Sequence, residues 1–75
     1  MPKVPRITGE EAIKAFGKAG FALDRVRGAH HILRHPEKIV RLSIPVHKGD
    51  TLGIGLLRKQ IKDAGMTVEE FVALL

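Results

Sequence analysis

The chain has 75 residues and no cysteine, which suits a single domain and excludes disulfides and thiolate metal clusters. Thirteen Lys and Arg residues against eight Asp and Glu give a net charge of +5, which favours an anionic partner such as nucleic acid, although a domain that is merely basic remains an alternative. The sequence has neither an apolar run long enough to span a membrane nor a secretory signal, so we expect a cytoplasmic protein without a membrane partner.

The chain begins with a short basic arm, residues 1–6, and we expect residues 7–75 to form the folded domain. Thr8 and Glu11 have the spacing of a capping box, in which each side chain pairs with the backbone at the start of a helix. Apolar residues follow at helical spacing, and Gly20 is well placed to end the helix.

Three strands are expected next, at residues 21–27, 30–35 and 39–46. Gly28 and Ala29 form a short hairpin connection between the first two, and a turn at Pro36 precedes the third. In the third strand alternate residues should face the core, namely Val40, Leu42, Ile44 and Val46. Pro45 indicates that this strand is at an edge or frayed, because proline cannot donate to a sheet ladder.

The remaining sequence predicts two helices. One spans residues 56–64 and ends at Gly65, and the other starts with a second capping box at Thr67 and Glu70. The last helix carries an apolar stripe that we expect in the core, made of Val68, Phe71, Val72 and Leu75. The fold class is therefore α+β in the order α-β-β-β-α-α, a three-stranded antiparallel sheet with helices on one face.

Three of the four histidines lie close together, at positions 30, 31 and 35. On a strand, His30 and His31 point to opposite faces, while His31 and His35 lie ~13 Å apart at ~3.3 Å per residue. One metal ion with bonds of ~2 Å cannot bridge that distance, so we expect no metal site and no cofactor.

Acid–base chemistry needs only one well-placed histidine. The expected strands also carry four arginines, Arg25, Arg27, Arg34 and Arg41. This combination suits phosphodiester cleavage, because guanidinium groups bind phosphate while an imidazole takes a proton from a ribose 2'-hydroxyl. Solvated histidines on a polar strand are the alternative, and the spacing of the residues leaves both open.

Two stretches resemble one known family. GFALDRVRGAHHILRHP resembles the signature of the HicA family of small toxins, with a glycine–aromatic opening, a basic strand, G-S-x-H and a further H-P. PVHKGD and the later GLLRKQIKDAGMTVEEF resemble that family's P-x-H loop and its last two helices. The likeness runs from about Ile7 to Leu75.

The resemblance implies a fold similar to a double-stranded-RNA-binding domain and activity as an mRNA interferase, an endoribonuclease of a type II toxin–antitoxin pair. It implies a HicB-type antitoxin as partner, with the toxin monomeric when free or hetero-oligomeric with the antitoxin. His31 occupies the place of the family's required histidine. The residues expected to contact RNA are Arg25, Arg27, Gly28, Ala29, His30, Arg34 and Lys48. A non-catalytic RNA-binding module of the same fold is the alternative function.

Two positions depart from the family pattern. Ala29 replaces the usual serine and removes a hydroxyl beside the expected catalytic position. Leu56 replaces the usual threonine at the start of a helix, which we expect to remove an N-cap oxygen worth ~1 kcal/mol.

Overall fold

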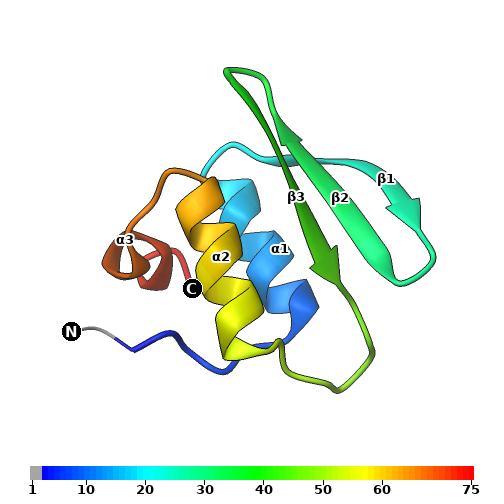
Figure 1. Cartoon of the computed structure of the whole chain (residues 1–75), viewed down its shortest axis with the longest axis vertical. Helices are drawn as coiled ribbons and strands as arrows, with labels where there is room; N and C mark the ends of the chain where they lie inside the picture. The colour runs from blue at the N-terminus through cyan, green and yellow to red at the C-terminus, as the bar shows by residue number, and fades with distance from the viewer. Residues whose placement is uncertain (1–2) are drawn as a thin grey trace.

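The protein is a three-stranded antiparallel sheet with three helices on one side, as seen in a computed structural model that describes residues 3–75 (Figure 1). The strands lie in the order β1-β2-β3, so β2 is central. The elements are α1 (Gly9–Lys18), β1 (Ala22–Arg27), β2 (His30–His35), β3 (Lys38–Pro45), α2 (Ile54–Asp63) and α3 (Val68–Val72). The expected α+β class, element order and placement of the helices are confirmed.

Two of the helices begin as the sequence predicts, with complete capping boxes. At α1 the Glu11 backbone N–H donates to Thr8 Oγ1 at 3.2 Å, and the Thr8 backbone N–H donates to Glu11 Oε1 at 3.0 Å. Thr67 and Glu70 repeat the arrangement at α3. These bonds satisfy backbone donors that the first helical turn leaves without partners.

Helix α2 begins earlier than expected, so the prediction that Leu56 lies at the start of the helix is wrong, although the helix has no side-chain N-cap bond. The N-cap is Gly53, whose carbonyl accepts a hydrogen bond from the Leu57 N–H at 3.0 Å. Leu56 is the third residue of the helix, where it packs against the core. The two added residues, Ile54 and Gly55, were missed because glycine is a poor helix former.

The core lies between the sheet and the helices, and all three phenylalanines are buried in it. Phe16 packs edge-to-face against Phe21 and at a tilt against Phe71, with ring centroids 5.8 Å and 4.8 Å apart. Val4, which belongs to the expected N-terminal arm, is also buried in the core. Residues 1–2 of that arm lie outside the described residues, and the boundary after residue 6 stays a prediction.

The prediction that the apolar stripe of the last helix lies in the core is only partly confirmed. Phe71 is buried and Val68 packs against the core, but Val72 and Leu75 are exposed. Because α3 ends at Val72 after five residues, Leu75 does not continue the helical repeat, and Leu74 packs against the core instead.

The helices cover the sheet unevenly, because α1 and α2 pack against β3 (Figure 1). On β3 the expected alternation holds, since Leu42 and Ile44 are fully buried. Pro45 is the last residue of this edge strand, a position that does not require a backbone donor. At the opposite edge, Leu23 and Val26 of β1 remain exposed.

Candidate functional site

His30 and His31 lie on opposite faces of the central strand, as strand alternation predicts. His31 is paired with Val26 on one side and with Ile44 on the other. Since Ile44 is fully buried against the helices, His31 faces the helix layer. His30 is paired with Arg27 and faces away from the helices. We call the side of the sheet that bears His30 the open face.

The ring of His31 has two different nitrogen environments. Its Nδ1 is buried and has no hydrogen-bond partner, and it is the one such side-chain atom among the described residues. Nε2 is not buried in this way. A neutral imidazole carries one proton, and an unpaired N–H is costly to bury. The arrangement therefore favours the form of His31 with the proton on Nε2.

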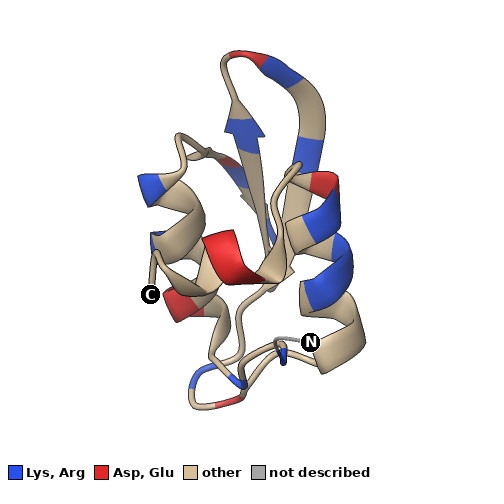
Figure 2. Cartoon of the chain, turned by 90° about the vertical axis from the view of Figure 1, so that its left-hand side faces the viewer, with Lys and Arg blue, Asp and Glu red and all other residues tan. Residues whose placement is uncertain are grey.

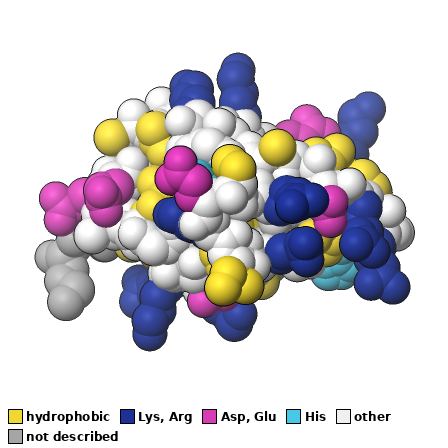
Figure 3. Space-filling view, turned by 90° about the horizontal axis from the view of Figure 1, so that it is seen from above, with side chains coloured by type: hydrophobic (Ala, Val, Ile, Leu, Met, Phe, Trp, Pro, Cys, Tyr) yellow, Lys and Arg dark blue, Asp and Glu magenta, His cyan; other side chains and the backbone are white. Residues whose placement is uncertain are grey.

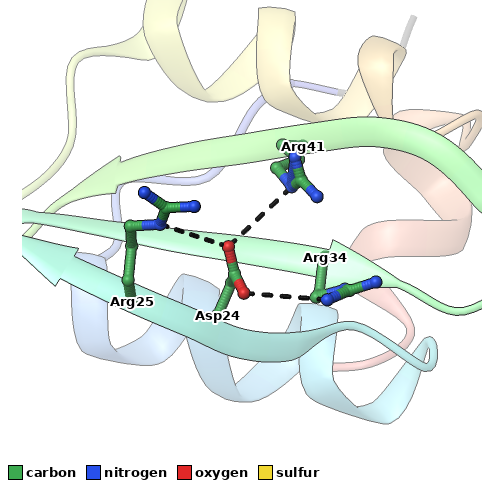
Figure 4. Close-up of polar contacts among 4 residues, drawn as sticks. All are labelled: Asp24, Arg25, Arg34 and Arg41. Atoms are coloured by element: carbon green, nitrogen blue, oxygen red, sulfur yellow. Dashed lines mark hydrogen bonds and ion pairs between the residues drawn. The ribbon is translucent and has the colours of Figure 1, made fainter.

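The open face carries a cluster of three arginines around one carboxylate, shown in Figure 4. Asp24 Oδ2 lies 3.4 Å from Arg25 Nε and 3.9 Å from Arg41 Nε, and Asp24 Oδ1 lies 3.8 Å from Arg34 Nη1. We call these four residues the arginine cluster. The sequence pattern groups these arginines with a catalytic histidine, but they do not surround His31, because Arg25, Arg34 and Arg41 lie on the open face while His31 faces the helices.

A bulge in β1 brings Asp24 to the arginine cluster. The register of β1 against β2 shifts between Leu23 and Arg25, so Asp24 has no direct partner across the ladder. A bulge redirects a side chain that regular alternation would send to the other face. Alternation did place Arg41 outward, but no sequence signal revealed the bulge, and Asp24 was missed for that reason.

His30 has a partner of its own on the open face. Its Nδ1 lies 3.2 Å from Ser43 Oγ of β3. Its cross-strand partner Arg27 lies at the end of β1 and is exposed. A hydroxyl, an imidazole and a guanidinium group are therefore presented side by side next to the hairpin turn.

The remaining predicted site residues occupy two loops. Gly28 and Ala29 form the β1–β2 turn, where Gly28 adopts a φ of +61° that favours glycine, and the Ala29 carbonyl accepts a hydrogen bond from the Val46 N–H at 2.8 Å. Lys48 lies in the turn after β3 and lines a hollow with Thr8 at the start of α1. The structure therefore does not bring Lys48 into the arginine cluster.

The third histidine of the segment, His35, has a structural role. Its Nδ1 accepts a hydrogen bond from the Glu37 N–H at 3.0 Å, which closes the β2–β3 turn. Its ring packs edge-on against Phe21, with centroids 5.1 Å apart. The absence of a side chain at Gly20 makes room for this ring, because a Cβ at Gly20 would lie 2.7 Å from His35 Nε2.

Positive charge is spread over several elements, while the acidic residues of α3 form a separate region (Figure 2). Seen from above, Lys and Arg side chains gather beside a histidine at the sheet end of the molecule (Figure 3). Within residues 3–75, no group of three His, Asp or Glu side chains is arranged to hold a metal ion. No helix in the same range is long and apolar enough to cross a membrane.

The fold and these surfaces define a small basic α+β protein with an uncovered, arginine-rich sheet face. A family described as "HicA toxin of bacterial toxin-antitoxin" matches residues 9–66, which is more than half of the chain. The chain therefore belongs to the HicA toxin family, and its role is that of a toxin that pairs with an antitoxin. The match ends at Met66, so α3 lies beyond it. No curated protein matches the chain.

Proposed function

We propose that this toxin is a metal-independent endoribonuclease that cleaves mRNA, with His31 as the general base. The observation that carries the proposal is the family match over residues 9–66, which includes the histidine motif ending at His31. The half-buried position of His31 beside the exposed Val26 supports it, because Nε2 is not buried in the way that Nδ1 is.

The reaction needs a proton acceptor and a site for phosphate. His31 takes the proton of a ribose 2'-hydroxyl, and the oxygen attacks the adjacent phosphorus while the bond from phosphorus to the 5'-oxygen breaks. The imidazolium then returns its proton to the departing 5'-oxygen. Basic side chains near the β1–β2 turn bind the phosphate and offset its developing charge.

The buried Nδ1 sets a limit on this chemistry. For Nε2 to accept a proton, the neutral ring must carry its proton on Nδ1, which has no partner in the structure. Burying an unpaired N–H costs about 1–3 kcal/mol, so the tautomer that the reaction requires has no acceptor to stabilise its Nδ1–H.

A variant at each adjacent histidine tests the proposal. We expect His31→Ala to lower the cleavage rate at least ~10²-fold, the usual contribution of a general base, while circular dichroism shows an intact fold. His30→Ala is the matched control on the other face and should keep most of the cleavage rate. Replacing the attacking 2'-hydroxyl by hydrogen should stop cleavage and leave binding intact. Full cleavage by a folded His31→Ala variant would contradict the assignment.

A non-catalytic RNA-binding module is the second candidate function, and the unpartnered Nδ1 of His31 favours it. The two are separated by incubating purified protein with single-stranded RNA in EDTA. Cleaved RNA supports the metal-independent enzyme, whereas a salt-sensitive complex with intact RNA supports the module.

We infer that the antitoxin is of the HicB type, and that the toxin is a monomer when free and hetero-oligomeric with its partner. The family assignment supports this inference. Co-expression with the product of a neighbouring reading frame, followed by purification and a cleavage assay, tests it. The expected result is a stable complex that no longer cleaves RNA, and a complex that cleaves at the full rate would overturn it.

A further inference from the structure

We propose that Asp24 is a positioning residue, which holds Arg25, Arg34 and Arg41 as a binding site for an RNA backbone phosphate on the open face. The inference rests on the proposed function, because it names where the substrate is held outside the reacting bond. Figure 4 shows the four side chains converging from three strands.

The carboxylate engages the arginines in a way that leaves most of their donors free. Asp24 approaches Arg25 and Arg41 through Nε, so the two terminal amino groups of each guanidinium are not used by this contact. Those groups form the fork that binds a phosphate in a bidentate manner. The guanidinium side chains are 60%, 56% and 53% exposed for Arg25, Arg34 and Arg41.

Asp24 itself is enclosed by the groups that it orients. Its side chain is 18% exposed, and it meets three cations, one of them from each strand. Without the carboxylate, Arg34 and Arg41 face each other as direct cross-strand partners, an arrangement of like charges that is unfavourable. Asp24 therefore stabilises a group of cations that would otherwise separate.

The charge of the arginine cluster suits one phosphodiester. Three guanidinium groups against one carboxylate leave an excess of two positive charges, so the site attracts an anion although it contains an acidic residue. Within the described residues, the helices lie on the other side of the sheet and leave the open face free for a ligand (Figure 1).

The location predicts a division between binding and chemistry. His31 faces the helix layer, whereas the arginine cluster lies on the open face. One strand of RNA therefore reaches both only by passing around an edge or an end of the sheet. The arginine cluster then holds a phosphate that flanks the cleaved bond, and its loss should raise KM while kcat stays constant.

The decisive comparison uses two variants that make the same change in charge. Asp24→Asn and Asp63→Asn each remove one negative charge, but Asp63 pairs with Lys59 on α2, away from the arginine cluster. If charge alone governed binding, both variants would bind RNA at least as tightly as the parent. We expect Asp24→Asn to bind about three- to tenfold more weakly, because the arginines lose their orientation.

A second pair of variants measures the phosphate contact. Arg41→Gln should reduce the slope of log affinity against log salt by about 1, whereas Arg58→Gln on α2 should leave the slope unchanged. All affinities are measured with single-stranded RNA in a His31→Ala background, so that the RNA stays intact.

Inorganic phosphate should also shift the Nε–H NMR signals of Arg25 and Arg41, and Asp24→Asn should abolish the shift.

These outcomes separate this inference from the proposed activity. Phosphate binding and RNA affinity are measured without cleavage, so an inactive wild type contradicts the ribonuclease and leaves the arginine cluster supported if the shifts appear. Equal affinities for Asp24→Asn and Asp63→Asn would overturn the role of Asp24. Unchanged RNA affinity together with lost antitoxin binding in Arg41→Gln would assign the open face to the partner protein and overturn the inference.

Discussion

The two faces of the sheet contain neighbouring residues of the same strands and differ in almost every physical property. The helix-facing side of β2 and β3 carries Leu33, Leu42 and Ile44, which are buried, and the half-buried His31. The open face carries the arginine cluster and His30 with its Ser43 partner. His30 and His31, which are adjacent in sequence, therefore lie on opposite faces of the sheet.

A strand that is rich in arginine therefore need not surround its histidine with cations. His31 lies beside apolar side chains, and its Nδ1 is buried, because the helix-facing side excludes water. The cations lie where their side chains remain hydrated. The proposed phosphate site and the proposed base therefore lie on different faces, and a substitution can alter one without altering the other.

The largest expected effect is on stability, and it should differ between the two faces of the sheet. Leu33 is 1% exposed and lies in the core, whereas its neighbour Ile32 is half-buried on the open face. We expect Leu33→Ala to lower the free energy of unfolding by about 2–5 kcal/mol, through lost burial and a cavity. Ile32→Ala should cost about 1 kcal/mol. Urea denaturation measures both, and equal losses would contradict the assignment of the faces.

A smaller effect is expected from the turn that precedes His31. Ala29 lies in the β1–β2 turn, two residues before His31. In Ala29→Ser, a hydroxyl can accept from the Nδ1–H of His31 and stabilise the form that accepts a proton at Nε2. A hydrogen bond of this kind contributes about 0.5–1.5 kcal/mol, so the cleavage rate should rise about two- to tenfold.

The readout for Ala29→Ser is kcat under single-turnover conditions. RNA affinity should stay constant, because the arginine cluster is untouched. Ala29→Val serves as the control, since it adds bulk without an acceptor and should not raise the rate. A rate increase in both variants would assign the effect to packing and not to the hydroxyl.

The smallest effect comes from α3 and tests the helix layer alone. The Thr67 backbone N–H donates to Glu70 at 2.8 Å, and this bond, with that of the Thr67 side chain, holds the pKa of Glu70 below its ordinary value of 4.5. A lowered carboxyl pKa stabilises the folded state above the ordinary pKa, and this contribution disappears as the pH falls through the lowered pKa.

Glu70→Gln should therefore weaken the acid dependence of stability below pH 4.5, while RNA affinity near neutral pH stays unchanged. Thermal unfolding followed from neutral to acidic pH measures the change. Glu69→Gln on the same helix is the control, and an identical response in both variants would contradict the role of the capping box.

Much of the fold was predictable because local chemistry determines it. The capping boxes at Thr8 and Thr67 and the turn at Gly28 require few residues, all adjacent in sequence, and the structure contains each of them. The burial of Leu42 and Ile44 followed from alternation.

The parts that were missed depend on contacts between distant elements. Alternation separated His30 from His31, but the side on which the helices pack decides which of them lies with the arginines. The position of Asp24 depends on a bulge, and α2 starts after Gly53 without a side-chain cap bond that the sequence could have revealed. None of these has a distinctive local pattern.

The bulge at Asp24 also affects the behaviour of the free toxin. β1 is an outer strand with exposed Leu23 and Val26, the kind of edge along which identical chains pair and aggregate. The register shift between Leu23 and Arg25 interrupts the regular ladder of that edge, and the charged side chains beside it repel a second copy. The bulge that brings Asp24 to the arginines thus also makes this edge a poor template for pairing with a second copy.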